Sequence, residues 1–221
     1  APGSGGALTG SGGVTHDPFY ADAAMTQLVV QSTVLAGDTT LEAGQSISGG
    51  DLSLATGSTL TIHEGAALDV ETLALPAGSG LVIHRGSALI GRIEMEPDAT
   101  LNVVDGDLSL DPAGDGSYHT ISGSFTFFNC LGSLQINGNT SFSGSTLGLA
   151  SDIHVLPGST MLVLGSLILD GCRLDSTGTF SLLVNYGASF QMKRCEVKGA
   201  AVSLVGSDVT LQDNQFTSSS V

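Results

Sequence analysis

A small or turn-forming residue recurs every 20 or 21 residues along most of this 221-residue chain. The series is Gly37, Gly57, Gly78, Asp98, Tyr118, Gly138, Gly158, Gly178 and Gly199. Apolar residues between these markers keep the same phase, because Leu60, Leu81 and Leu101 align when the sequence is divided at the markers. A fixed period of this length is typical of a solenoid, in which each repeat forms one turn and packs against the next.

Alternation within one repeat indicates strands. In residues 57–77 we expect six apolar side chains to point inward: Leu60, Ile62, Leu68, Val70, Leu73 and Leu75. The residues expected to point outward are Thr59, Thr61, His63, Asp69, Glu71 and Thr72. Three short strands separated by turns fit this length, and parallel crossovers are almost always right-handed. The sequence therefore predicts an all-β fold, a right-handed single-stranded parallel β-helix (β-solenoid) of about nine coils of 20–21 residues with an N-terminal arm or cap.

Three segments follow from composition and periodicity. Residues 1–13 are rich in Gly and Ser, which predicts a flexible arm. Residues 14–36 are expected to form an N-terminal cap or exchange strand, in which Gln27 to Leu35 has the pattern of a strand. Residues 37–221 are expected to form the β-helix domain.

Two groups of segments resemble known proteins. LDGCRL (169–174), MKRCEV (192–197) and LQDNQF (211–216) resemble coils of the right-handed parallel β-helix, or pectin-lyase-like, superfamily. The coils at 57–70, 78–91 and 98–110 are similar to repeats of filamentous haemagglutinins and autotransporter passengers. The resemblance implies a small polar residue that stacks on itself at a turn. It implies architecture rather than activity, because this fold carries enzymes, adhesins and inert fibres alike.

Charge excludes several classes of partner. Six Lys and Arg against 21 Asp and Glu give a net charge of -15, which repels nucleic acid and anionic lipid. No apolar run is long enough to cross a bilayer. Polysaccharide lyases and hydrolases of this superfamily use basic residues or paired aspartates, and the chain offers few cations and no Asp-Asp pair. We therefore expect no enzyme and assign no catalytic, cofactor-binding or metal-binding residue.

Two groups of side chains are candidate metal ligands. Asp105, Asp107, Asp111 and Asp115 lie within 12 residues and could bind calcium, although a solvated acidic turn is the favoured interpretation. His63 and His84 lie 21 residues apart and are expected to stack on adjacent coils, with Glu64 beside Arg85. Because only two imidazoles are evident, an exposed pair plus a weak ion pair is favoured over a metal site.

The cysteines suggest a stacked column. Cys172 and Cys195 occupy equivalent places, and Asn214 follows in the next coil. A disulfide between adjacent coils is compatible with their spacing, but a structural ladder of reduced thiols is the favoured interpretation. Cys130 is the third cysteine of the chain.

Threonine recurs at a position expected to face outward, as Thr40, Thr59, Thr100, Thr120, Thr140, Thr160 and Thr179. Such a column could bind ice, yet threonine favours strands for steric reasons, and its neighbouring column is irregular. If Thr160 faces outward, then so do Leu162, Leu164 and Leu183, and an exposed apolar surface of this kind usually marks an interface.

The last coil ends in QFTSSSV (215–221) without a segment that would cover it, and an open strand edge is a template for another chain. The leading hypothesis is therefore a non-enzymatic extracellular structural β-solenoid that associates with itself end to end into a filament or surface fibre. The alternative is a glycan-binding adhesin or phage tailspike-like module, and a polysaccharide lyase or hydrolase ranks third. The expected partners are copies of the chain itself or, in the alternative, glycans, and the expected location is extracellular or at the cell surface.

Overall fold

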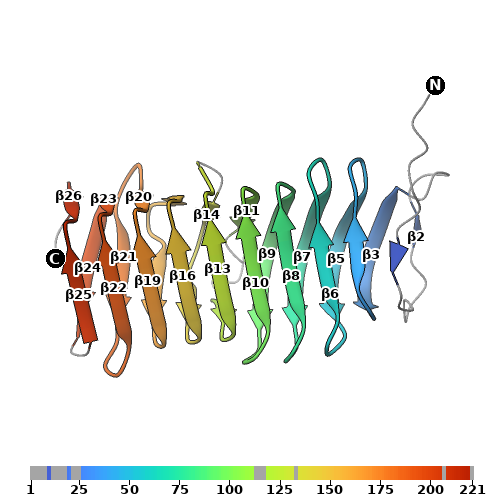
Figure 1. The fold of residues 1–221 in the computed structure, drawn as a ribbon, viewed down its shortest axis with the longest axis horizontal. Coiled ribbons are helices and arrows are strands. Elements are labelled where there is room, and N and C mark those ends of the chain that lie inside the picture. Colours follow the sequence, from blue (N-terminus) through green and yellow to red (C-terminus); the bar gives the residue numbers. More distant parts are fainter. Residues whose placement is uncertain are drawn as a thin grey trace.

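The structure, a computed structural model, describes residues 9–10, 19–20, 26–111, 118–131, 134–205 and 208–219. Strands and turns account for all of these residues, and parallel sheets stack into an elongated β-solenoid of about nine turns (Figure 1). The all-β solenoid predicted from the repeat is confirmed.

Three walls surround the interior. Wall A is a sheet in which each strand pairs in parallel with the strand one turn later. Its parallel strands are β4 (Thr39–Leu41), β6 (Thr59–Ile62), β8 (Gly80–His84), β10 (Thr100–Val104), β13 (Ser124–Phe128), β16 (Ser145–Leu149), β19 (Ser166–Asp170), β22 (Ser189–Lys193) and β25 (Asp208–Gln212).

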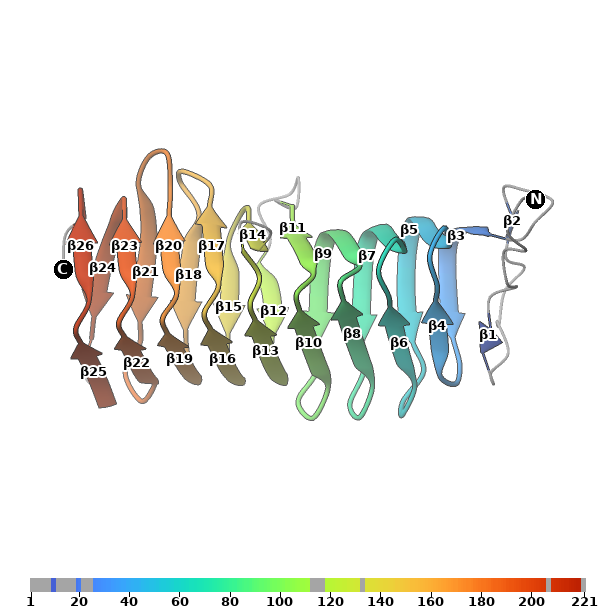
Figure 2. The same cartoon turned by 45° about the horizontal axis from the view of Figure 1, so that its top comes forward.

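Walls B and C are the two arms of a second sheet, and they share nine-residue strands in the first turns. The shared strands are β3 (Gln27–Leu35), β5 (Ser46–Leu54), β7 (Ala67–Leu75) and β9 (Ser87–Met95). Wall B continues as β11 (Asp107–Leu110), β14 (Leu134–Ile136), β17 (Asp152–Val155), β20 (Arg173–Asp175), β23 (Glu196–Lys198) and β26 (Gln215–Thr217). Wall C continues as β12 (His119–Ile121), β15 (Thr140–Phe142), β18 (Thr160–Val163), β21 (Phe180–Val184) and β24 (Ala200–Leu204), as Figure 2 shows from a second direction.

The shared strands differ from the three separate strands per coil that we expected. In β7 the alternation shifts by one residue, since Glu71 and Thr72 both face outward between the buried Val70 and Leu73. The strand therefore bends from wall B to wall C, and its pairing with β9 skips Glu71 at the bend but keeps the same register on either side of it. Gly49 of β5 lies at this bend with a φ of 125°, and a Cβ there would lie 2.2 Å from the carbonyl oxygen of Val30. The close approach of β5 to β3 at this position therefore requires glycine in β5, whereas β7 has Val70 at the paired position.

The interior is a continuous column of apolar side chains. All six residues predicted to point inward in residues 57–77 are buried. Leu60 pairs with Leu81, and Leu81 pairs with Leu101, as the phase of the repeat predicts. Burial of each leucine contributes about 1.5–3 kcal/mol relative to an exposed position, so the stacked columns are the main stabilising element.

The marker series changes walls in the fifth turn, and the predicted register is wrong from that point. Up to Asp98 each marker precedes a strand of wall A, whereas Tyr118 and the later markers precede strands of wall C. On wall A, Thr100 pairs with Ser124, which lies 24 residues on, while the preceding step from Gly80 to Thr100 is 20 residues. The additional residues lie between β11 and β12. Each turn of the coil has several corners that contain glycine. The additional residues between β11 and β12 therefore shift the marker series from the corner before wall A to the corner before wall C, while the spacing of the markers persists.

The predicted outward column of threonines is consequently wrong. Thr59 and Thr100 lie on wall A, Thr120 and Thr160 lie on wall C, and Thr140 points into the interior, where it is buried. The ice-binding alternative depended on a regular outward array of these threonines, and they do not form one.

The first turn begins earlier than the boundary at residue 37. β3 pairs in parallel with β5 in the same manner as β5 pairs with β7, so Gln27–Leu35 is a wall strand. Two short strands pair antiparallel with the first strands, β1 (Thr9–Gly10) with β4 and β2 (Phe19–Tyr20) with β3. The remainder of residues 1–25 lies outside the described residues.

Gly148 tests how tightly the interior is packed. It pairs with Phe127, and a Cβ at Gly148 would lie 2.2 Å from Phe127 Cζ and 2.8 Å from Leu169 Cδ2. We predict that Gly148→Ala lowers the free energy of unfolding by about 1–3 kcal/mol, because it overpacks the core. Phe127→Leu should relieve part of this penalty, so the double variant will lose less than the sum of the single variants in urea denaturation. Strict additivity would show that the ring does not fill the space above Gly148.

Candidate functional surfaces

A ladder of small polar residues lies at the corner between walls A and B. Its members, each one turn apart, are Cys130, Ser151, Cys172, Cys195 and Asn214. The residue before each member has a positive φ, and these residues are Asn129, Ala150, Gly171, Arg194 and Asp213. A left-handed residue turns the chain through this corner, and the following side chain then points inward. The predicted stacking of Cys172, Cys195 and Asn214 is confirmed, while Cys130 and Ser151 were not included in the prediction.

Hydrogen bonds connect neighbouring members of the ladder. Ser151 Oγ accepts from the Cys130 N–H at 3.1 Å, and Asn214 Oδ1 accepts from the Cys195 N–H at 2.9 Å. All three cysteines are buried and free. The hydrogen bond with Cys195 and burial both raise the pKa of the Cys172 thiol, and burial raises the pKa of Cys130. Buried thiols with a raised pKa are poor nucleophiles and poor metal ligands, which applies to Cys130 and Cys172, whereas the hydrogen bond with Cys172 lowers the pKa of Cys195.

The predicted histidine pair is present. The rings of His63 and His84 lie edge to face with their centroids 6.2 Å apart. Arg85 lies 3.9 Å from Glu64, as expected, and 3.9 Å from Asp105. These ion pairs are largely exposed, so each contributes about 0–1 kcal/mol. Among the residues that the structure describes, no group of three or more His, Cys, Asp or Glu side chains is arranged to hold a metal ion.

The aspartates of residues 105–116 have different neighbours. Asp105 lies near Arg85 and accepts a hydrogen bond from Asn129 Nδ2. Asp107 is exposed on wall B, and Asp111 accepts from Asn137 Nδ2 at 3.3 Å, at the end of β11 that leads toward wall C. Asp115 lies outside the described residues.

A buried polar layer lies at the first strand of the separate wall C. His119 is completely buried, and its Nδ1 accepts from the Ile93 N–H at 3.4 Å. Its proton must therefore reside on Nε2, for which no hydrogen-bond partner is found among the described residues. Thr140, its neighbour one turn later, is also buried with no partner found there for its hydroxyl. Desolvation lowers the pKa of His119, although Asn137 and Asp111 oppose the shift.

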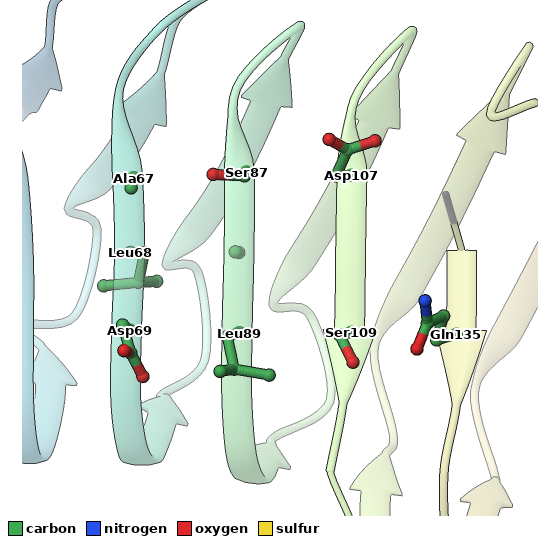
Figure 3. A pocket seen from close by; sticks show the side chains of 9 residues that line it. Ala67, Leu68, Asp69, Ser87, Leu89, Asp107, Ser109 and Gln135 are labelled. Atoms are coloured by element: carbon green, nitrogen blue, oxygen red, sulfur yellow. The ribbon is translucent and has the colours of Figure 1, made fainter. Parts of the chain in front are cut away.

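Wall B carries a shallow hollow of about 490 Å³ (Figure 3). Two outward columns line it, the first with Ala67, Ser87 and Asp107 and the second with Asp69, Leu89, Ser109 and Gln135. A second hollow of about 540 Å³ shares Asp69 and Leu89 and follows the bend toward wall C. Small side chains, carboxylates, hydroxyls, an amide and one exposed leucine therefore form a surface of mixed polar and apolar character.

Wall C exposes apolar side chains in its last turns. Leu164 and Leu183 are exposed and Leu162 is half-buried, so the predicted outward orientation of these three leucines is confirmed. Leu162 pairs directly with Leu183.

The strands β24, β25 and β26 form the last described turn, and no described strand pairs with their outer edges. Their inward residues are less buried than the equivalents one turn earlier. Leu211 is 39 % exposed, whereas Met192, with which it pairs, is 0 % exposed. Val209, Leu204 and Phe216 are only partly buried.

No protein-family model matches this sequence, and neither a curated protein nor a solved structure matches it. The described residues contain no helix of the length and hydrophobicity needed to traverse a lipid bilayer.

His119 generates a prediction on pH dependence. Its folded pKa lies below the ordinary value of 6.5, so the unfolded state binds the additional proton. The stability contributed by the neutral ring is complete above pH 6.5 and is lost as the pH falls through the folded pKa. We predict that His119→Leu flattens the decline of the urea midpoint below pH 6.5.

Thr140→Val is the matched control, because it alters the same layer and keeps the imidazole. It should retain the pH dependence of the parent protein. An unchanged decline in His119→Leu would show that other groups govern the acid response.

Proposed function

We propose that this chain is a non-enzymatic structural β-solenoid that associates with itself end to end into a filament or surface fibre. The observation that carries the proposal is the way in which the turns join: each strand pairs in parallel with a strand of the next turn, and inward residues of the last described turn are incompletely buried. Leu211 of β25 is 39 % exposed, whereas Met192, with which it pairs one turn earlier, is completely buried. A parallel stack extends by the same hydrogen bonds and apolar contacts that join its turns, so a turn supplied by another copy would pack on this stack in the same way.

Long-range charge opposes this association. The net charge of -15 makes copies repel one another, and salt screens that repulsion over about 8–10 Å at 0.1–0.15 M ionic strength. Short-range contacts at the edge favour association and oppose this repulsion. Assembly should therefore strengthen as ionic strength rises, which distinguishes it from association through ion pairs.

The proposal also includes the superfamily of the fold and the cellular location of the protein. A right-handed coil of the pectin-lyase-like superfamily is supported by the turn length and by the corner ladder from Cys130 to Asn214. An extracellular or cell-surface location is supported by the acidic, lysine-poor composition of a fibre-forming rod.

A glycan-binding module is the second candidate, and the hollow on wall B favours it. Asp69, Asp107, Ser109 and Gln135 supply acceptors and donors for hydroxyl groups, and Leu89 supplies an apolar contact. A shallow hollow of this mixed composition suits a neutral saccharide chain rather than an anionic one, because its carboxylates repel anions.

We predict that Leu211→Lys weakens end-to-end association about a hundredfold, because a charge would be buried where the next turn stacks. Thr210→Lys is the matched control, since it adds the same charge on the same strand but on the outer surface of wall A. Sedimentation velocity and negative-stain particle lengths at several concentrations and salt levels measure the effect. Isolated rods of the parent protein under every condition would contradict the proposal.

For the second candidate, we predict that a neutral glycan found on an array loses at least about tenfold in affinity in Ala67→Arg, which obstructs the hollow. Thr59→Arg makes a comparable change on wall A and should leave binding intact. The reverse pattern would place the glycan on wall A, and binding unaffected by either change would remove the hollow from consideration.

A further inference from the structure

Wall C is uncharged over its last four strands. Its outward residues on β15, β18, β21 and β24 are Ser141, Thr160, Leu162, Ser181, Leu183, Ala201 and Ser203. These strands lie side by side along one side of the rod (Figure 2). The chain carries a net charge of -15, so a surface of this extent without charge is a distinct feature.

The charges of the same turns are confined to the other walls. Between residues 134 and 205 the charged residues on wall B are Asp152, Arg173, Asp175, Glu196 and Lys198. The others, at the ends of wall A strands and in the following corner, are Asp170, Lys193 and Arg194. Arg194 Nη2 donates hydrogen bonds to both carboxylate oxygens of Asp170 at 2.7 Å, so these two opposite charges pair with each other at that corner.

Apolar side chains occupy the uncharged wall. Leu162 and Leu183 pair across adjacent turns, and Leu164 follows directly after β18. Tyr186, in the turn after β21, is 84 % exposed, and Val205, after β24, is 58 % exposed. These five residues form what we name the wall C patch. Two of them lie on strands of wall C and three lie in the turns that follow those strands, and exposed apolar side chains gathered in this way usually mark an interface.

We infer that the wall C patch is a lateral interface between two copies of this chain. The distribution of charge favours a second copy of this chain as the partner, because two strongly acidic rods approach each other with least repulsion where neither carries charge. The patch is also self-complementary in chemistry, so a two-fold pairing brings the leucines of one copy against those of the other. This pairing is independent of the end-to-end association proposed above and yields a fibre two rods wide.

Leu183→Glu tests the inference, and Leu89→Glu is its matched control. Both leucines are 37 % exposed and face outward from a wall strand, but Leu89 lies on wall B. We expect Leu183→Glu to weaken lateral dimerisation about a hundredfold, because each interface would bury two like charges. Leu89→Glu, which adds the same charge, should leave the dimer intact.

The measurement separates the two modes of association. In sedimentation velocity and negative stain, lateral pairing doubles the width of the particles, whereas end-to-end association increases their length. Lateral dimers should persist in Leu211→Lys and disappear in Leu183→Glu. Particles of single-rod width at all concentrations would overturn the inference, as would equal loss of the dimer in both glutamate variants. Binding of phosphatidylcholine vesicles by a protein that remains one rod wide would overturn it as well, since the patch would then face lipid.

Discussion

Parallel hydrogen bonding between successive turns is the constraint on which the structure depends. Each strand pairs with a strand about one turn away, as Gly80 pairs with Thr100 on wall A, and this places like residues above one another. Inward side chains then form unbroken columns such as Leu60, Leu81 and Leu101. A single turn buries little by itself. Its stability comes from its two neighbours, so the ends of the stack are the places where backbone and core are incompletely satisfied.

The sequence was sufficient for the repeat and for the inward set, because alternation in a strand fixes which side chains share a face. It was insufficient for the register after the fourth turn. Several corners of each turn accept glycine or another turn-forming residue, so the marker at Tyr118 has the expected spacing although it precedes wall C. Thr140 illustrates the consequence, because one displaced corner moved it from the predicted outer surface to the interior.

The candidate sites also divide into those that the local sequence predicted and those that it did not. The stacking of Cys172, Cys195 and Asn214 was predictable because each lies at the same place in a local pattern. Cys130 has no such pattern around it, and its equivalence emerges only from the pairing of β13 with β16. His119 was not identified at all. Its hydrogen bond comes from Ile93, 26 residues away, and nothing in the local sequence indicates that partner.

A solenoid separates stability from surface chemistry, and this separation explains why the three walls differ. Inward residues are mostly apolar, with exceptions such as His119 and Thr140, while outward residues vary from wall to wall without affecting the core. In the last turns the charges gather on wall B and at its corner with wall A, and wall C remains neutral. In the proposed assembly, a rod of charge -15 would resist indiscriminate aggregation at long range and associate through one wall and one edge at short range. The distribution of charge among the walls, rather than its total, would therefore determine where the proposed contacts between copies form.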